Sequence, residues 1–490
     1  MSATSRARWG VGAVVILASA VLVTHALYFR AIFDGNCPDD AYISFRYAEN
    51  LAEGRGLVFN AGERVEGYSN FLWVLLLAAN TPFVDDLTGA AQLWGVLAAC
   101  AALVLVALAA RDRFAQHNPL TLAFGLLLLA GSGYYAGWSV SGLESGLFAL
   151  LLLAAWFRYS VEIESEHERL PLSAGLFGLL AMARPEGVLI ALGMIAVHLL
   201  LFARAQVGAR RRWAFPAALL IVVLSYEAFR FVYYGAHWAP NSVRAKVGLS
   251  WSQIQRGSTY VTTRFAYPYA LLLLSAVLAP RLWRRPAFVV GQLLFVGYLV
   301  FVIAVGGDWS RGRFFAPVLP LGSVLLLAVC GRIRTLGWLV GALYLVGCFV
   351  VTTPRGEGRN WQLWTRGDAE RIAIGRWLRD AAPPDAVVGV LAAGQIPYYS
   401  KLRTHDMLGL NDAHIANLDV RRMGRGTPGH EKIDPDYTLT RVRPDLIIGG
   451  DRLVFYKRHP AFEPQYRRVT HFWTLHEVYV RRDFLPRLQR

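Results

Sequence analysis

Residues 89–110 read GAAQLWGVLAACAALVLVALAA, a run of 22 residues without a charge that ends at Arg111 and Arg113. An α-helix rises about 1.5 Å per residue, so this run can cross the roughly 30 Å hydrocarbon core of a bilayer. Similar runs recur along the chain, which is 55% hydrophobic and has a positive mean hydropathy. The sequence therefore predicts a polytopic α-helical membrane protein and excludes a soluble globular one.

The apolar runs predict the number of spans. The first follows Arg6 and Arg8, is too long for the apolar part of a signal peptide and lacks a cleavage signal, so we expect it to remain as an anchor. If 71–84 is a hairpin or an interfacial helix, about eleven spans remain. The runs are 9–28, 71–84, 89–110, 120–135, 147–157, 172–183, 187–202, 215–233, 265–278, 288–305, 315–329 and 336–351.

Arginine marks every second junction between these runs, and connections rich in Lys and Arg are typically cytoplasmic. We therefore expect a bacterial inner membrane protein with its N-terminus inside and its C-terminus in the periplasm. Topology also explains the formal charge of +16, so no nucleic-acid partner is predicted. The marked positions are Arg111, Arg113, Arg158, Arg204, Arg210, Arg211, Arg212, Arg281, Arg284, Arg285, Arg332 and Arg334.

Membrane character stops at about residue 354. We expect a transmembrane catalytic domain over 1–353 and a small periplasmic α/β domain over 354–490. Helical spacing appears in AERIAIGRWLRD (369–380), and strand-like runs appear in AVVGVLAAG (386–394), DLIIGG (445–450) and HEVYVRR (476–482).

The loops of the exterior face carry charged, aromatic and Gly-rich residues. Such residues at the ends of membrane helices are costly unless they line a water-filled cavity or bind a ligand, so this face is the predicted functional one. By contrast, SVEIESEHER (160–169) is expected to be a solvated cytoplasmic connector. The exterior segments are 38–70, 132–145, 183–187, 233–246 and 306–315.

Asp39 and Asp40 directly follow the first span. Adjacent Asp residues can simply cap a helix, because Asp is favoured at N-cap positions. The segment after them predicts an amphipathic helix ending near Gly54 or Gly56, with Tyr42, Phe45 and Leu51 on the membrane surface. That arrangement would hold the two carboxylates at the mouth of a cavity.

Transfer of a sugar from a phosphate-linked donor needs a carboxylate that deprotonates the acceptor hydroxyl or stabilises the oxocarbenium-like centre. It also needs cations that stabilise the departing phosphate. The exterior loops offer both. The candidate carboxylates are Asp39, Asp40, Glu144, Glu186 and Asp308; the candidate phosphate and sugar partners are Arg184, Asn241, Arg244, Lys246, Arg311 and Arg313.

Simpler interpretations stay open for several of these residues. Glu144 and Arg184 can pair at helix ends and merely satisfy each other. GGDWSRGRFF (306–315) can anchor the chain at the headgroup level, and YYGAHWAPNSVRAK (233–246) can belong to an aromatic belt.

The sequence predicts no metal ligands. HDMLGLNDAH (405–414) could hold a metal or a sugar, but its spacing matches no standard ligand pattern, and Asn/Asp clusters usually form turns. The four cysteines have neither metal nor disulfide spacing. Two adjacent carboxylates permit a divalent cation without requiring one.

The segment DDAYISFRYAENLAEGRGLVFNAGERVEGYSNFLW (39–73) resembles the GT-C superfamily of glycosyltransferases. Within it, the chain is similar to the terminal arabinofuranosyltransferases of mycobacterial arabinogalactan and lipoarabinomannan synthesis. SGLES (141–145), ARPEG (183–187), GGDWSRGRFFAPVLPL (306–321) and HDMLGLNDAHIA (405–416) extend the likeness.

The resemblance implies an exterior active site and a polyprenyl-phosphate sugar donor. It also implies an envelope glycan or glycolipid acceptor, which the C-terminal domain helps to hold. GT-C enzymes carry an essential Asp or Glu in the first exterior loop, and the matching positions are Asp39 and Asp40.

Two other classes compete with the enzyme. A transporter or lipid flippase places ionisable groups near the bilayer midplane and often has repeated halves, which this sequence lacks. A non-catalytic glycan- or lipid-binding scaffold would keep the aromatic and basic loops but would not need Asp39 and Asp40.

Overall fold

A computed structural model describes residues 3–203, 208–235, 237, 239–246, 248, 250–264, 280–308, 310, 312–330, 365–420, 423–469 and 473–488. The chain forms two compact units, each built from three separate segments. Unit 1 comprises 1–35, 91–230 and 251–360, and unit 2 comprises 36–90, 231–250 and 361–490. The predicted domain boundary near 354 lies outside the described residues and remains a prediction.

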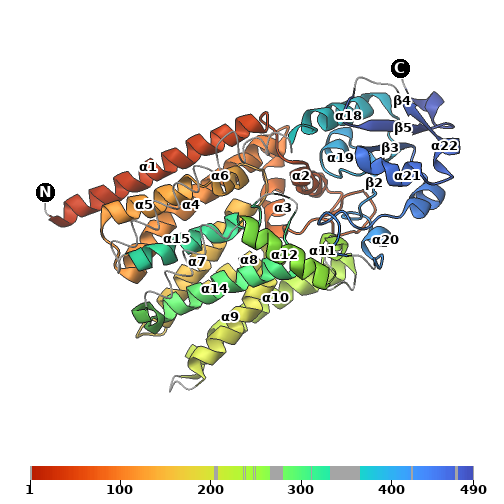
Figure 1. The fold of residues 1–490 in the computed structure, drawn as a ribbon. Coiled ribbons are helices and arrows are strands. Elements are labelled where there is room, and N and C mark those ends of the chain that lie inside the picture. Colours follow the sequence, from red (N-terminus) through yellow and green to blue (C-terminus); the bar gives the residue numbers. More distant parts are fainter. Residues whose placement is uncertain are drawn as a thin grey trace. The chain divides into compact units, whose positions relative to one another are not determined.

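Unit 1 is a bundle of helices that run side by side (Figure 1). Most of its helices are apolar on all faces, which is typical of helices surrounded by lipid and by other helices. Its helices are α1 (Ala3–Ile32), α4 (Leu87–Phe114), α5 (Pro119–Ala130), α6 (Gly133–Ser139), α7 (Ser145–Ile163), α8 (Leu172–Ala183), α9 (Glu186–Phe202), α10 (Ala209–Tyr234), α12 (Trp251–Arg264), α14 (Pro286–Ala304) and α15 (Leu319–Cys330), with short 3₁₀ turns at Pro280–Arg284 and Ala316–Val318.

Five described helices are long and apolar enough to cross a membrane. They are Gly10–Ile32 of α1, α4, α7, α10 and α14. Four shorter apolar helices accompany them, at Phe71–Phe83, Leu172–Ala183, Glu186–Phe202 and Ala316–Cys330. The predicted spans 265–278 and 336–351 lie outside the described residues.

The predicted span 120–135 is broken rather than continuous. α5 and α6 meet at an angle of 59°, and they give a sixth candidate span if counted together. The break lies at Gly131 and Ser132, where the Ser132 hydroxyl accepts a hydrogen bond from the Tyr135 amide and starts a new helix. A Ser N-cap inside an apolar run explains why hydropathy alone missed the bend.

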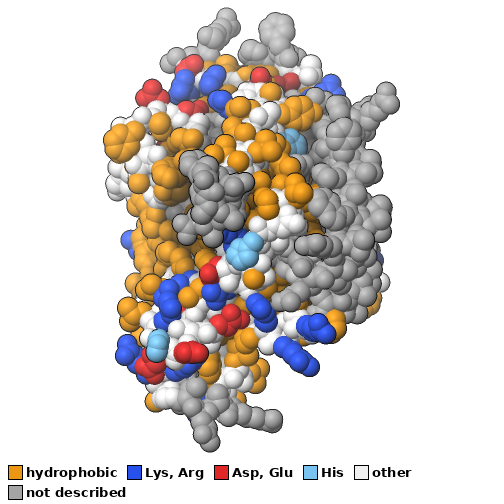
Figure 2. Space-filling view, turned by 90° about the vertical axis from the view of Figure 1, so that its left-hand side faces the viewer, with side chains coloured by type: hydrophobic (Ala, Val, Ile, Leu, Met, Phe, Trp, Pro, Cys, Tyr) orange, Lys and Arg blue, Asp and Glu red, His pale blue; other side chains and the backbone are white. Residues whose placement is uncertain are grey.

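Three of the Arg-rich junctions predicted to be cytoplasmic, those of Arg113, Arg211 and Arg285, come together at one end of unit 1. Arg285 donates to the Arg113 carbonyl, Arg113 pairs with Glu164, and Arg211 donates to the carbonyl of Ile163. Figure 2 shows basic, acidic and His side chains among hydrophobic ones on one face of the molecule. The contacts agree with the prediction that these junctions share one side of the membrane.

Unit 2 contains a five-stranded mixed sheet of order β2-β1-β3-β5-β4. β1 (Val387–Val390) is parallel to β2 (Arg403–Asp406) and β3 (Leu446–Gly449), whereas β5 (Glu477–Arg481) is antiparallel to β3 and β4 (Tyr466–Val469). Its helices and turns are α2 (Asp39–Ala52), α3 (Phe71–Ala78), α11 (Asn241–Lys246), α18 (Asp368–Ala381), α19 (Gln395–Ser400), α20 (Ala413–Ala416), α21 (Val454–Lys457) and α22 (Phe462–Gln465), with single turns at Thr81–Phe83, Tyr437–Val442, Asp451–Leu453 and Leu485–Arg487.

The predicted mixed α/β character of the C-terminal part is confirmed. β1, β3 and β5 form within the segments where the sequence predicted strands, and α18 extends one residue beyond each end of the predicted helical segment. The eight-residue α3 is too short to cross a bilayer, in agreement with the interpretation of 71–84 as a short helix. The side of the membrane on which this unit lies stays a prediction.

Candidate functional site

A buried ionic cluster in unit 1 gathers three predicted site residues. Arg184 follows α8, and Glu186 is the first residue of α9, so the Pro185 turn between them presents both side chains together. Arg184 Nε lies 2.7 Å from Glu186 Oε1 and 3.6 Å from Glu144 Oε1. All three residues are 5% exposed or less. Glu144 and Arg184 therefore do pair, as the simpler interpretation predicted.

This pairing leaves part of the arginine unused. Arg184 Nη1 is buried without a hydrogen-bond partner among the residues that the structure describes. The guanidinium also lies over the rings of Phe148 and Phe314, at 5.7 and 5.2 Å from their centroids. A buried N–H donor without an acceptor is costly, and phosphate and carboxylate oxygens are the acceptors that arginine binds strongly.

An apolar cavity of about 290 Å³ lies beside this cluster, between α9 and α14. Glu186 and Tyr298 line its polar end, and the Tyr298 hydroxyl lies 3.5 Å from Glu186 Oε1. The rest of the wall is apolar and is formed by Leu189, Ile190, Gly193, Met194, Val197, Leu293, Leu294, Gly297 and Phe301. A charged end joined to an apolar channel suits an amphiphilic ligand.

GGDWSRGRFF also belongs to unit 1. Gly306, Gly307 and Gly312 have positive φ angles of 84°, 68° and 65°, a backbone conformation that favours glycine. The Ser310 hydroxyl donates to Asp308 Oδ2 at 2.5 Å, and Arg313 Nη1 lies 4.0 Å from the same oxygen. The predicted phosphate partner Arg311 lies outside the described residues.

Asp39 of unit 2 is held by backbone amides. Gly394 N donates to its Oδ2 at 3.0 Å, and Gln395 N donates to its Oδ1 at 2.8 Å. Arg371 Nε lies 3.6 Å from Oδ1. Burial raises the pKa of Asp39, while Arg371 and the amides oppose this shift. Its oxygens thus have fixed partners within the fold.

The prediction that Tyr42 and Phe45 lie on the membrane surface is wrong. Both side chains are fully buried in unit 2, where each packs edge-on against the ring of Tyr398. Leu51 is half-buried. The amphipathic face of α2 was correctly recognised, but it is covered by protein instead of lipid.

Asp40, Asn241 and Lys246 also belong to unit 2. Asp40 is half-buried in the first turn of α2. Burial lowers the pKa of His430; the charge of Lys246 adds to this shift, and the charge of Asp40 opposes it. Asn241 Nδ2 donates to the carbonyls of Gly409, Leu410 and Asp412, and Asn241 Oδ1 accepts from the candidate cation Arg244. The Asn241 side chain therefore ties α11 to a loop of the sheet.

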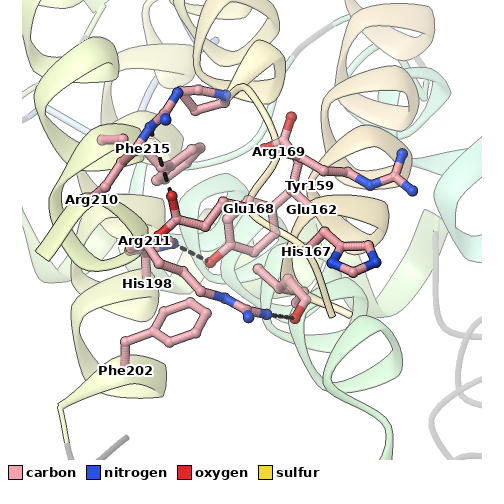
Figure 3. Close-up of a pocket in the computed structure, with 13 residues that line it drawn as sticks. Tyr159, Glu162, His167, Glu168, Arg169, His198, Phe202, Arg210, Arg211 and Phe215 are labelled. Carbon is pink, nitrogen blue, oxygen red and sulfur yellow. Dashed lines mark hydrogen bonds and ion pairs between the residues drawn. The ribbon is translucent and has the colours of Figure 1, made fainter. Parts of the chain in front are cut away.

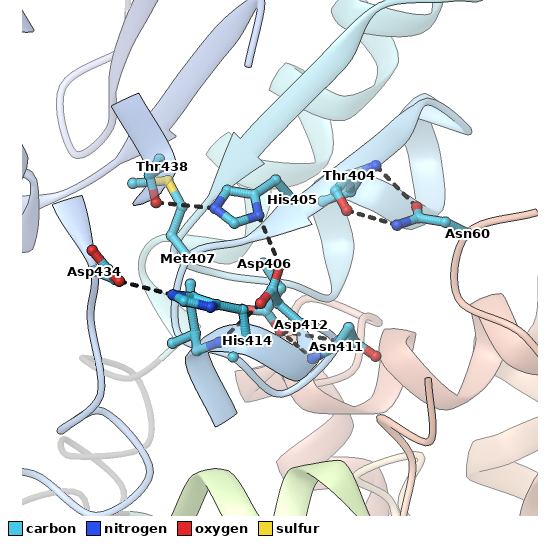
Figure 4. A network of polar contacts seen from close by, with 12 residues as sticks. Asn60, Thr404, His405, Asp406, Met407, Asn411, Asp412, His414, Asp434 and Thr438 are labelled. Atoms are coloured by element: carbon cyan, nitrogen blue, oxygen red, sulfur yellow. Dashed lines mark hydrogen bonds and ion pairs between the residues drawn. The ribbon is translucent and has the colours of Figure 1, made fainter. Parts of the chain in front are cut away.

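The acidic and His-rich segment 405–414, which runs from the end of β2 to the start of α20, forms a network of polar contacts (Figure 4). His405 lies between Asp412 and Thr438, at 3.2 and 3.0 Å, and Asp406 accepts hydrogen bonds from Leu408 N and Asn411 N. Within the described ranges no group of three or more His, Cys, Asp or Glu side chains could hold a metal ion.

A second, smaller cavity of about 40 Å³ lies in unit 1 among the ends of α7, α9 and α10 and the connector 164–171 (Figure 3). Arg210 Nε lies 3.9 Å from Glu168 Oε2 there, and Tyr159 Oη lies 3.0 Å from His198 Nδ1. None of the predicted site residues lines this cavity.

The predicted site residues thus fall into two groups. Glu144, Arg184 and Glu186 meet in unit 1, where Asp308 also acts electrostatically on Arg184. The second group, in unit 2, contains Asp39, Asp40, Asn241 and Lys246. Sequence reasoning missed Tyr298, which lies in an apolar run, and Arg371, which was noted only as part of a segment with helical spacing.

Solved structures identify the fold. ArnT from Cupriavidus metallidurans, solved with bound undecaprenyl phosphate, matches 95% of this chain and 97% of its own length with a TM-score of 0.57 at 14% identity. The oligosaccharyltransferase of Archaeoglobus fulgidus matches 93% of this chain and 72% of its own, also with a TM-score of 0.57, at 10% identity. The chain has the GT-C fold.

The sequence also resembles curated proteins. Two curated proteins are each named terminal β-(1→2)-arabinofuranosyltransferase. The one from Mycobacterium tuberculosis is 30% identical over 62% of this chain and 55% of its own length; the one from Corynebacterium glutamicum is 28% identical over 59% and 47%. The chain spans about half the length of these relatives. Residues 359–486 also match a family model described as a domain of unknown function, DUF8728.

Proposed function

We propose that this protein is a membrane glycosyltransferase that moves a sugar from a polyprenyl-phosphate donor to an envelope glycan or glycolipid. Arabinofuranose is the first sugar to test, because both curated relatives are named for its transfer. One observation carries the proposal most directly. The buried Arg184, with Nη1 lacking a partner among the described residues, lies beside the polar end of an apolar cavity.

The chemistry of this site matches a lipid-linked phosphate. The apolar wall between α9 and α14 would bind isoprene units, and Arg184 would bind the phosphate. Arg313 is the second proposed phosphate partner, because it also lies in unit 1 and follows Asp308 in the same tight loop. Arg311 and Lys246 keep this role as predictions.

Asp40 is the proposed acceptor base. It would take the proton from an acceptor hydroxyl as the acceptor oxygen bonds to the anomeric carbon, while the bond from that carbon to the phosphate oxygen breaks. Polyprenyl phosphate then leaves with the bonding electrons and is stabilised by the arginines. Asp39 would orient the start of α2, since its carboxylate already accepts two backbone amides.

The proposed topology keeps about eleven spans, with the N-terminus in the cytoplasm and unit 2 in the periplasm. We expect a Cys at Asp380, whose side chain is 74% exposed, to be labelled from the exterior in a Cys-free background. A Cys at Glu168, 45% exposed, should be labelled only after permeabilisation. The opposite pattern would overturn both the orientation and the exterior site.

The cavity makes a prediction about donor length. A Cβ at Gly297 would meet no atom within 4 Å, so Gly297→Leu should fold and fill the cavity. The Leu side chain would take the place of about two methylenes of the donor chain in the cavity. At roughly 0.8 kcal/mol each, this loss of contact should raise the KM of a long-chain donor about tenfold. A donor with a short, soluble chain should be unaffected.

Gly175→Leu is the matched control for this variant. Gly175 lies in α8, does not line the cavity, and also has open space where a Cβ would be. Steady-state kinetics with both donors measure the effect. Equal KM values for Gly297→Leu and Gly175→Leu with the long donor would remove the cavity from the donor site.

The function itself is tested with purified protein in detergent, a synthetic polyprenyl-phospho-arabinofuranose and an oligosaccharide acceptor. Formation of an extended acceptor with release of polyprenyl phosphate is the expected result. A flippase or a binding scaffold would yield no product in this assay. A lipid extract from a deletion strain, analysed beside its envelope glycan, would identify the native donor and acceptor.

A further inference from the structure

The guanidinium of Arg371 is shared by two carboxylates of unit 2. Its Nη2 donates to Asp368 Oδ1, and its Nε lies 3.6 Å from Asp39 Oδ1. The Asp368 side chain is 5% exposed, that of Arg371 15% and that of Asp39 18%, so this bridge is largely shielded from water. Shielded bridges respond strongly to the loss of one partner.

Gln395 completes the bridge. Arg371 Nε donates to Gln395 Oε1 at 2.8 Å, and Gln395 Nε2 donates to the Cys37 carbonyl at 3.0 Å, two residues before Asp39. Gly394 is required by the same geometry, because a Cβ there would lie 1.7 Å from the Asp39 carbonyl oxygen. Helices α18 and α19 therefore hold the start of α2 in place through side-chain and backbone contacts.

We propose that Arg371 is a positioning residue, which fixes Asp39 against α19 and thereby sets the direction in which the neighbouring Asp40 points. This inference rests on the proposed function, in which Asp40 is the acceptor base. It assigns to the C-terminal part of the chain a role in the geometry of transfer. Arg371 itself needs no contact with donor or acceptor.

The bridge also has a pH dependence. Burial raises the pKa of Asp368 to about 6, with Arg371 opposing the shift and Asp39 adding to it. The other polar and titratable groups that face Arg371 and its two carboxylates are Asp40, Gln395 and His476. His476 Nε2 lies 3.4 Å from Arg371 Nη1, and His476 Nδ1 pairs with Glu370. As the pH falls below about 6, Asp368 takes up a proton and holds Arg371 less firmly.

The test compares Arg371→Ala, Arg371→Lys and Asp368→Asn with the unchanged protein in the transfer assay. Small displacements of a catalytic group can cost up to about a hundredfold in rate, so Arg371→Ala should lower kcat about ten- to a hundredfold. Donor KM should stay unchanged. Arg371→Lys should recover part of the loss, and Asp368→Asn should remove an inflection near pH 6 from the pH profile of kcat.

Arg379→Ala is the matched control, because Arg379 lies on the same helix, is 52% exposed and pairs only with its neighbour Asp380 among the described residues. Amide hydrogen exchange over 39–52 gives a readout that does not depend on activity. Arg371→Ala should speed exchange there, and Arg379→Ala should not. If Arg371→Ala fails to fold, Arg371→Lys and Asp368→Asn carry the comparison.

Two failures are distinguishable. Absence of transfer by the unchanged protein would refute the proposed function, and hydrogen exchange would still report whether Arg371 orders the start of α2. Normal kcat, pH profile and exchange in Arg371→Ala and Arg371→Lys, in a protein that does transfer sugar, would overturn the positioning role alone.

Discussion

Asp40→Asn is expected to lower sugar transfer by about a hundredfold or more, the usual scale for loss of a general base. The amide keeps the shape of the carboxylate but cannot accept the acceptor proton. Donor binding should survive, because Arg184 and the apolar cavity belong to unit 1 and Asp40 to unit 2. Single-turnover kinetics with a bound donor would separate the two steps.

Asp39→Asn is the paired variant and should cost less. Asp39 accepts two backbone amides, and Asn still offers one oxygen to them, although its NH₂ group must face the other amide. We expect Asp39→Asn to lower stability and to displace the start of α2. A larger loss of transfer in Asp39→Asn than in Asp40→Asn would exchange the two roles, and full activity in both would refute a catalytic role for this loop.

Arg184→Ala should destabilise unit 1 by about 3 to 5 kcal/mol, because it removes the buried cation that lies 2.7 Å from Glu186 and 3.6 Å from Glu144. Glu144 is 2% exposed and Glu186 4%, so neither can recover hydration without local opening. The rings of Phe148 and Phe314 also lose their contact with the guanidinium. Thermal unfolding in detergent measures the loss.

A triple variant separates the stability effect from function. Arg184→Leu with Glu144→Gln and Glu186→Gln removes all three charges, and replacing a buried ion pair by neutral groups is often close to neutral in stability. This variant should recover much of the stability but no transfer, because the proposed phosphate partner is gone. Normal donor use by the triple variant would show that the cluster has only a structural role.

Composition and charge spacing were enough to predict the helical membrane character, because both follow from local sequence. The long uncharged runs became α4, α7, α10 and α14, and the Arg-rich junctions do meet. The break at Ser132 was missed because a capping hydroxyl barely changes hydropathy. The two edge strands β2 and β4 were missed because their sequences, RTHD and YRRV, are short and rich in charge, as edge strands often are.

Pairings between distant segments could not be predicted from one sequence. Glu144 with Arg184 was foreseeable from their places at helix ends, but the contact of Asp39 with α19 joins positions more than 350 residues apart. The same limit explains the error at Tyr42 and Phe45. An amphipathic face shows that something apolar covers it, and it does not show whether that cover is lipid or protein.

α2 contacts residues that lie far from it along the sequence, and this distance affects how the protein is made. Arg46 of α2 donates to the carbonyls of Pro397 and Leu402, which lie 351 and 356 residues further along the chain. At about 5 to 20 residues per second, a ribosome needs roughly 20 to 70 s to make that intervening chain. Asp39 and Asp40 leave the ribosome long before their partners Gly394 and Gln395, so their native setting forms only after those residues have been made. A nascent chain would thus hold the segment around Asp39 and Asp40 in an immature state until α19 has been made, which delays the proposed chemistry until α2 and α19 have met.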